Sequence, residues 1–489
     1  MIRQEKEEGV TEVMLPGREE RSVLWSEAVA QAEAYFDDVA SLPVAPKLDL
    51  AELQRVLASF SFDEPDSRME VLQRYMGEWK KHQVHVPHPC YFGLFNPAPT
   101  FMSILGDLMT ATVNPQLAAW SHSPLAVDTE RHLVAAFAEK FGLPPEDADG
   151  CLTIGGAEAN LTGMLCALVK RWPGILEDGM QGVKEKPVFY GSAESHHTFV
   201  KAARMAGLGR SALRTVPVTD DLQIDLATLR RMIEEDRASG REPFMVIGTA
   251  GTTSAGIVDP LAELKKIAQA QGMWFHVDAA WGGAAVLVPE LRRAVAGIED
   301  ADSITFDAHK FLSMPMGTGM FLTRQRDVLG RMFAVSTSYM PKEGQRMAVV
   351  DPYVHSLQWS RRFIGLKLFL TLATTGWSGY AQVLRHQVEM GKLLRERLIA
   401  SGWSVVNRTE LPLVCFTPAN ESWDTMMHQK AAEAVVASGK AWISSVLLGG
   451  KVPALRACIT NYRTGPQDIE TLMAVLTEVR DAVVAGRCG

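Results

Sequence analysis

Residues 273–281 read MWFHVDAAW and residues 303–311 read SITFDAHKF, and these two stretches decide the fold. Each is a short apolar run that ends in polar residues, which is typical of a buried β-strand reaching the edge of its sheet. Between about residues 150 and 325, similar runs alternate with amphipathic helical stretches such as PLAELKKIAQAQG at 260–272. This alternation predicts βα units around a mainly parallel sheet, and therefore an α/β fold.

The chain on either side of this region has a different pattern. Residues 17–80 carry apolar residues at helical spacing, with a proline-containing interruption at 43–47. The proline-rich stretch 85–101 favours an ordered loop, and loops of this kind often line binding sites. Residues 361–400 read as helix with a break at TTGWSG, and the chain then mixes strand-like and helical runs. We therefore expect three units: a helical N-terminal segment (1–95), a large cofactor-binding domain (96–375) and a small α+β C-terminal domain (376–489).

Composition and charge argue against several classes of protein. The 489 residues include 49 Lys and Arg against 57 Asp and Glu, a net charge of −8 without a long basic run, which argues against nucleic-acid binding. No stretch approaches the roughly 20 consecutive apolar residues of a membrane helix. The first residues, MIRQEKEEGV, do not resemble a secretory signal, so a cytoplasmic protein is expected. The six cysteines lack CxxC spacing, so neither a metal site nor a disulfide framework is expected.

Three groups of residues in the α/β region could carry chemistry. The Gly-Gly-Ala turn at 155–157 joins a strand to a helix, and its backbone N–H groups could bind an anion, although such turns are often plain connectors. Asp278 ends a strand where α/β sheets bind ligands, and would otherwise be a helix N-cap. Lys310 follows His309 between apolar neighbours, where a desolvated amine can be a nucleophile, although a lone lysine is usually a surface residue.

The combination of these groups is more specific than any one of them. Pyridoxal phosphate needs an amine for its aldehyde, a carboxylate that keeps its ring nitrogen protonated, and N–H donors for its phosphate. The anion turn, the strand-end Asp and the strand-end His-Lys pair supply all three within one α/β region. The sequence therefore indicates a pyridoxal-phosphate enzyme.

The order of five segments resembles the group II pyridoxal-phosphate-dependent amino acid decarboxylases, the family of aromatic amino acid and glutamate decarboxylases. The segments are LTIGGAEANL (152–161), SAESHHTFVKAA (192–203), GTAGTTSAGIVDPL (248–261), WFHVDAAWGGA (274–284) and SITFDAHKFL (303–312). The resemblance covers roughly residues 85–470. It implies an aspartate-aminotransferase-like fold (fold type I), an amino acid substrate, and a homodimer with each active site at the subunit interface.

The resemblance also assigns the cofactor-binding residues. Lys310 would form the imine, Asp278 would pair with the pyridine nitrogen, Ala280 would lie under the ring, and His196 would stack on its other face. The residues expected at the phosphate or beside the ring are Gly156, Ala157, Asp307, His309 and Thr253. Many relatives have Asn where this chain has Asp307, which leaves the role of this residue open.

The resemblance further implies catalytic and substrate-binding residues. With Lys310 and His196, the catalytic set includes Tyr339, because STSYMPK (336–342) aligns with the mobile loop whose tyrosine protonates Cα; otherwise Tyr339 is only a loop aromatic. Arg456, in LRACIT, would hold the substrate carboxylate, with a strand-edge salt bridge as the alternative. The expected pocket residues are Phe95, Asn96 and Trp120, the last from the partner chain, although such aromatic residues are often core.

The resulting prediction is decarboxylation of an L-amino acid to the corresponding amine and carbon dioxide. Two alternatives use the same cofactor: an aminotransferase, and an oxidative deaminase that forms an aldehyde after decarboxylation. Enzymes of the second kind typically replace the loop tyrosine or the stacking histidine, and this chain has both. A non-catalytic homologue is the least favoured alternative, because Lys310, Asp278 and His196 are all present. The sequence leaves the substrate side chain open.

Overall fold

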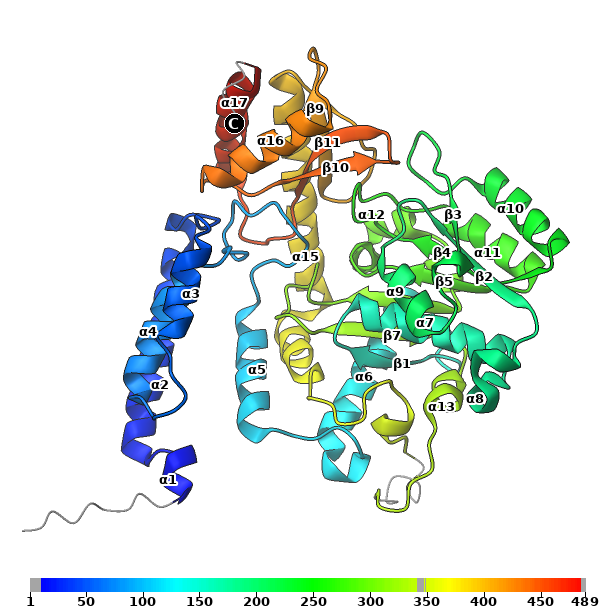
Figure 1. The fold of residues 1–489 in the computed structure, drawn as a ribbon, viewed down its shortest axis with the longest axis horizontal. Helices are drawn as coiled ribbons and strands as arrows, with labels where there is room; N and C mark the ends of the chain where they lie inside the picture. Colours follow the sequence, from blue (N-terminus) through cyan, green and yellow to red (C-terminus); the bar gives the residue numbers. More distant parts are fainter. Residues whose placement is uncertain (1–9, 341–346, 348, 485–489) are drawn as a thin grey trace, which may run out of the picture.

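The structure is a computed structural model that describes residues 10–340, 347 and 349–484. Its largest unit is a seven-stranded sheet with the order β1-β7-β6-β5-β4-β2-β3 (Figure 1). In that order the strands are Asp149–Thr153, Gly319–Thr323, Ser303–Asp307, Trp274–Asp278, Arg241–Thr249, Lys186–Ser192 and Leu213–Val216. The pairings from β6 across to β3 are parallel, whereas both pairings of β7 are antiparallel. The predicted mainly parallel sheet is confirmed.

Helices cover both faces of this sheet. One layer consists of α6 (Pro124–Phe141), α10 (Leu226–Ala238), α11 (Leu261–Gln271) and α15 (Gly365–Ala400), and the other of α7 (Gly156–Arg171), α9 (Thr198–Met205) and α13 (Val328–Phe333). Side chains alternate between the layers along each strand. In β5, Phe275 and Val277 pack in the first layer and Trp274 packs in the second. Two apolar layers enclose the sheet, as its parallel pairing requires.

The N-terminal helices stand beside this body, as the blue column in Figure 1 shows. They are α1 (Val10–Met14), α2 (Arg18–Asp38), α3 (Leu50–Ala58) and α4 (Arg68–Lys81), and α5 (Phe101–Val113) follows against α15. The helices α2, α3 and α4 contain no buried residue, and Trp25 and Trp79 are both half exposed. The predicted helical segment is confirmed. Many of its apolar side chains are exposed to solvent in the single chain.

A second, antiparallel sheet forms the C-terminal unit. Its order is β10-β11-β9-β8, with strands Ser444–Leu448, Val452–Cys458, Leu413–Pro418 and Trp403–Val405. The helices α16 (Thr425–Ala437) and α17 (Pro466–Val484) pack on it together with the end of α15. The expected break in α15 is present at Gly376, whose φ of 66° suits glycine. The predicted boundary at 375/376 falls at this kink and stays a prediction, as does the boundary at 95/96.

The remaining short helices are α8 (Ile175–Asp178) and α12 (Pro289–Arg292). Within the described part of the chain, no helix is long and apolar enough to cross a membrane.

A buried ion pair ties the edge of the large sheet to α6 and to the segment that leads into α15. Arg361 Nη2 lies 2.7 Å from Glu130 Oε2, and both side chains are almost fully buried. Arg361 Nη1 also donates to the carbonyl of Leu152 on β1, at 3.1 Å. Glu130 Oε1 accepts from the backbone N–H of Gly365. This pair fixes β1 just before the chain turns into α7.

Breaking this pair should destabilise the fold. Arg361→Met leaves the Glu130 carboxylate buried without its cation, so we expect the free energy of unfolding to fall by about 3–5 kcal/mol. Urea unfolding followed by circular dichroism measures the change. The double variant Glu130→Leu/Arg361→Met should recover most of the loss, because neither charge then remains. As a control, Arg231→Met removes the exposed pair with Glu235 and should change stability by less than about 1 kcal/mol.

Candidate active site

The carboxyl ends of β4, β5 and β6 and the first turn of α7 surround a cavity of about 130 Å³. These strands are parallel, so their carboxyl ends meet at the edge of the sheet where α/β folds bind ligands. The predicted residues that line the cavity are Phe95, Gly156, Ala157, His196, Thr253, Asp278, Ala280, Asp307 and Lys310. The sheet therefore brings together residues that are spread over more than two hundred positions of the sequence.

Lys310 lies at this cavity beside an acidic neighbour. It follows β6 by three residues, and its Nζ lies 3.1 Å from Asp307 Oδ2. The Asp307 carboxylate is almost fully buried, and its Oδ2 also lies 3.7 Å from His309 Nε2. Burial lowers the pKa of His309, while the charge of Asp307 acts in the opposite direction. The Lys310 amine, the Asp307 carboxylate and the His309 imidazole thus form one cluster at the end of β6.

The glycine turn leaves room for a ligand next to this cluster. A Cβ on Gly156 would lie 2.9 Å from Asp307 Oδ2 and 3.4 Å from the Cβ of Ala280. Since α7 begins at Gly156, the first N–H groups of this helix have no acceptor inside the helix and can bind an anion. A Cβ on Gly155 would approach His309 Cε1 to 3.3 Å, so His309 lies against the same turn.

Asp278 is buried at the end of β5 with both carboxylate oxygens bound. Its Oδ1 accepts from the backbone N–H of Ala280 at 3.1 Å, and its Oδ2 accepts from Asn160 Nδ2 at 3.0 Å. Asn160 lies on α7, one turn after Gly156, and also lines the cavity. These hydrogen bonds hold the carboxylate in a fixed orientation at the cavity.

His196 lies at the opening of the cavity, in the turn before α9. Its Nδ1 lies 3.0 Å from the hydroxyl of Thr198 and accepts from the Thr198 backbone N–H at 3.2 Å. With Nδ1 bound in this way, the neutral ring carries its proton on Nε2. Desolvation by surrounding protein lowers the pKa of His196, with the charge of Asp278 acting against this. In the single chain the side chain is still exposed to solvent.

Phe95 separates the cavity from Arg456. The Phe95 ring packs against Trp281 with a centroid distance of 4.8 Å, and the Arg456 guanidinium lies 4.9 Å from the same ring. Arg456 donates through Nε to the carbonyl of Thr253 and through Nη1 to the carbonyl of Gly93, both at 2.9 Å. Asn96 follows in the same loop and is partly buried.

Two of the predicted aromatic residues lie away from this cavity in the single chain. Tyr339 is 74% exposed and stacks on Trp359, with 6.4 Å between the ring centroids. Trp120 lies in a short 3₁₀ turn, where its Nε1 donates to Asp128. Residues 341 and 342 of the predicted loop lie outside the described residues. The structure therefore brings neither aromatic residue to Lys310 of its own chain.

The structure also shows cavity residues that the sequence reasoning did not single out. They are Asn160, Thr198, Thr249, Gly251 and Trp281. Asn160 carries a signal that was available: it is a polar residue on the apolar side of a helix that starts at the anion turn. Thr249 pairs in register with Asp278, so it follows once β4 and β5 are aligned.

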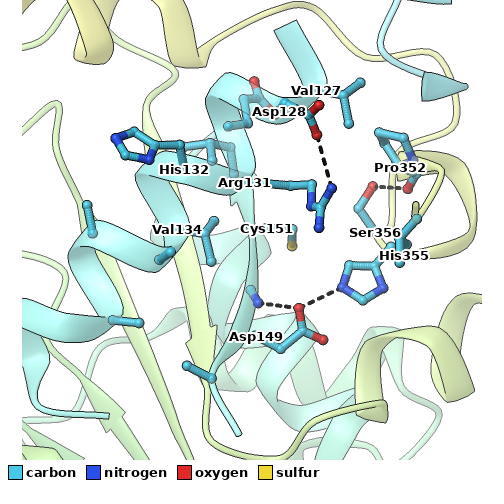
Figure 2. Close-up of a pocket in the computed structure, with 18 of the residues that line it drawn as sticks. Val127, Asp128, Arg131, His132, Val134, Asp149, Cys151, Pro352, His355 and Ser356 are labelled. Atoms are coloured by element: carbon cyan, nitrogen blue, oxygen red, sulfur yellow. Dashed lines mark hydrogen bonds and ion pairs between the residues drawn. The ribbon is translucent and has the colours of Figure 1, made fainter. Parts of the chain in front are cut away.

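A larger hollow, of about 820 Å³, lies elsewhere between α6, the amino end of β1 and the segment 350–361. Figure 2 shows that its polar side chains already contact one another. Arg131 pairs with Asp128 at 3.0 Å, and His355 pairs with Asp149 at 2.8 Å. No lysine is among the residues that line it, so it lacks the amine that an aldehyde cofactor needs.

The residues around the smaller cavity fit pyridoxal phosphate. It has an amine at Lys310, a buried carboxylate at Asp278 and a helix start with open space at Gly156. Among the described residues, Thr249 Oγ1, Asp307 Oδ1 and Arg456 Nη2 are buried without a hydrogen-bond partner. Buried polar atoms are rarely left in that state, so Thr249 Oγ1 and Asp307 Oδ1, which belong to residues lining the cavity, are positions where a bound ligand can supply a partner.

The chain is similar to known decarboxylases and to an aldehyde synthase. The chain is 28% identical to tyrosine decarboxylase 2 of Narcissus pseudonarcissus over 93% of both chains. It is 27% identical to phenylacetaldehyde synthase of Petunia hybrida over 88% of both chains. The solved structure of Oryza sativa TDC with PLP and tryptamine superposes with a TM-score of 0.89 at 24% identity, covering 96% of this chain and 99% of that one. That likeness establishes fold type I.

The family model described as the pyridoxal-dependent decarboxylase conserved domain matches residues 53–418, well over half of the chain. The matched span contains the glycine turn, the strand-end aspartates and Lys310. The chain belongs to the pyridoxal-dependent decarboxylase family and is a carboxy-lyase that uses pyridoxal phosphate to decarboxylate an amino acid.

Proposed function

We propose that Lys310, Asp278 and His196 carry the cofactor chemistry and that the substrate is an aromatic L-amino acid. The observation that supports the residue roles most directly is that these three side chains line one cavity at the carboxyl edge of the sheet. The aromatic substrate is proposed because Phe95 lines the cavity and Leu94, beside it, is an exposed apolar side chain. The tyrosine decarboxylase among the relatives agrees with this choice.

Each residue has one task in this proposal. When bound, pyridoxal phosphate supplies the electron sink that accepts the electron pair left at Cα as carbon dioxide departs. Lys310 would provide the amine, and Asp278 would pair with the protonated ring nitrogen. The turn at Gly156 and Ala157, with His309, would bind the phosphate, and His196 would cover one face of the ring.

The fate of the proton at Cα distinguishes the proposed reaction from its alternatives. An amine forms when a donor protonates Cα, and we propose the phenol of Tyr339 as this donor. An aldehyde forms when dioxygen oxidises Cα in place of protonation, with hydrogen peroxide and ammonia as the other products; one relative is named phenylacetaldehyde synthase. This chain retains both Tyr339 and His196, which favours the amine.

We also propose that the active enzyme is a homodimer. Around the cavity, His196, Thr253 and Ile154 are exposed in the single chain, and Ile154 is 61% exposed although it is apolar. Further apolar side chains are exposed on α2, α4 and α5, namely Val23, Trp25, Tyr75, Trp79, Met109 and Val113. We propose that a second copy covers these surfaces and that its Tyr339 and Trp120 lie at this cavity. Large apolar surfaces of this kind are typical of obligate dimers.

A cytoplasmic location is proposed from the cysteines. Cys90, Cys151, Cys166, Cys415 and Cys458 are free and buried in the described part of the chain. Free thiols are typical of proteins in reducing compartments.

The proposed role of Lys310 can be tested by replacing its side chain. Lys310→Ala should abolish carbon dioxide release and the borohydride-fixed cofactor label, because the amine that reacts with the aldehyde is gone. Mass spectrometry of the reduced, digested protein measures the label. The exposed lysine variant Lys201→Ala is the control and should keep both. In the parent enzyme, faster release from glutamate or diaminobutyrate than from tyrosine and tryptophan would contradict the aromatic substrate.

Arg456→Lys should weaken substrate use. A lysine keeps the charge but loses the planar set of donors, so kcat/KM should fall by about 10- to 100-fold. Steady-state carbon dioxide release measures this. Arg397→Lys, at an exposed pair with Glu470, is the matched control and should leave kcat/KM unchanged. An Arg456→Lys variant with unchanged kcat/KM would show that Arg456 is structural.

Tyr339 can be tested together with the dimer. Tyr339→Phe should lower amine formation by roughly 100-fold or more and divert product to the aldehyde, because the donor for Cα is lost. Lys310→Ala and Tyr339→Phe chains are then co-expressed with different tags and the mixed dimer is purified. If Tyr339 acts across the interface, the mixed dimer has one intact site and recovers roughly half of the parent's amine formation per dimer. No recovery would place Tyr339 in the site of its own chain.

A further inference from the structure

A buried polar seam runs between α7 and the strands β5 and β6. It contains Ser303 and Thr305 of β6, His276 of β5, and Asn160 of α7, and each of these side chains is no more than 1% exposed. Neighbouring buried strands of a parallel sheet are usually apolar on both faces. Burying these polar side chains costs free energy of folding unless they are hydrogen-bonded, so their presence calls for an explanation. It ends at the Asp278 carboxylate.

The hydrogen bonds of the seam have one consistent direction. Trp274 Nε1 donates to Ser303 Oγ at 2.8 Å, so the Ser303 hydroxyl can give its own proton to His276 Nδ1, also at 2.8 Å. Burial lowers the pKa of His276 to about 4, so the ring is neutral and carries one proton. With Nδ1 accepting, that proton lies on Nε2 and points to Asn160 Oδ1, at 3.0 Å.

This direction fixes the orientation of the Asn160 amide. Its Oδ1 accepts from His276 and, at 2.7 Å, from the Thr305 hydroxyl. Its Nδ2 must therefore face the other way, where it donates to Asp278 Oδ2 at 3.0 Å and to Thr198 Oγ1 at 3.1 Å. A flipped amide would set its oxygen against the Asp278 carboxylate and its N–H groups against two donors.

We propose that Asn160 is a positioning residue whose amide, oriented by His276 and Thr305, holds the Asp278 carboxylate for the ring nitrogen of the cofactor. The same amide is connected to His196 through the Thr198 hydroxyl. One side chain therefore links Asp278, proposed to pair with the ring nitrogen, to His196, proposed to cover the face of the ring. The inference rests on the proposed pairing of Asp278 with that nitrogen. It goes beyond that pairing by naming what holds the carboxylate in place.

The close approach of α7 supports this assignment. A Cβ on Gly163 would lie 2.9 Å from both Cε1 and Nδ1 of His276, so the helix can approach the ring only because residue 163 is glycine. The position therefore offers a way to move the His276 ring by one methyl group without touching Asn160 or Asp278.

The test measures cofactor binding in the full-length protein after removal of the cofactor. Dissociation constants are determined for pyridoxal phosphate and for its carbocyclic analogue, in which C–H replaces the ring nitrogen. Asn160→Asp keeps the size of the side chain but replaces the donor with a second carboxylate. We expect pyridoxal phosphate to bind about 10- to 100-fold more weakly, because a hydrogen bond to a charged group is lost. The analogue, which has no nitrogen to pair, should change by less than about threefold.

Three further variants make the result decisive. Gly163→Ala should shift the ratio of the two dissociation constants in the same direction as Asn160→Asp. If Asn160→Asp does not fold, the Gly163→Ala ratio serves as the test of the inference. Thr162→Val, on the same helix, removes a hydroxyl that donates to the carbonyl of Glu158 and should leave both constants unchanged. Asp278→Asn should by itself weaken the binding of pyridoxal phosphate more than that of the analogue.

The outcomes separate the inference from the proposal beneath it. Equal weakening of both ligands in Asn160→Asp, or no weakening of either, overturns the role of Asn160. If Asp278→Asn shifts the ratio and Asn160→Asp does not, the inference alone fails. If Asp278→Asn leaves the ratio unchanged, the proposed pairing of Asp278 with the ring nitrogen fails as well.

Discussion

The parallel register of β4, β5 and β6 is the constraint on which the site depends. Thr249 pairs with Asp278, and Asp278 pairs with Thr305, so the three side chains form one row on the face under α7. Because side chains alternate along a strand, a slip of one residue would turn Asp278 to the opposite helical layer. The apolar residues that precede them along the strands, such as Val277 and Ile304, pack in the opposite layer. A slip would expel these side chains from that layer, so their packing prevents it. The packing of the core thus holds the carboxylate at the cavity.

The second requirement is that α7 lies very close to the sheet. A Cβ on Gly319 would come within 2.7 Å of Gly155 Cα, and a Cβ on Gly163 would collide with His276. This close approach lets Asn160 reach two strands at once and presents the helix N-terminus to the end of β6. The cost is a row of buried polar groups, and every one of the bonds along it is needed to keep that cost small. Catalytic geometry and packing are therefore parts of the same contact.

Much of this arrangement could be predicted from the sequence, and the exceptions have physical reasons. The positions of Asp278 and Lys310 follow from local pattern, because each comes at or just after the end of a short apolar run. The antiparallel strand β7 is as apolar as its parallel neighbours, so its direction cannot be read from composition. Asn160 was missed because its partners lie 116 and 118 residues away. The signal was nevertheless present: Trp274, His276 and Asp278 alternate with apolar residues, where a strand buried on both faces would be apolar throughout.

Asp307 is central to the charge balance of the cavity. Its Oδ2 lies close to both Lys310 Nζ and the glycine turn at the start of α7. The same carboxylate therefore faces the lysine amine and the helix N-terminus. The ion pair with Lys310 offsets the charge of Asp307, whose side chain is almost fully buried. His309 lies 3.7 Å from the same oxygen, and burial lowers the pKa of its imidazole. The positive end of α7 also lies beside this carboxylate, because a Cβ on Gly156 would come within 2.9 Å of Asp307 Oδ2. The Asp307 carboxylate therefore lies between the lysine amine and the start of α7, and both offset its negative charge.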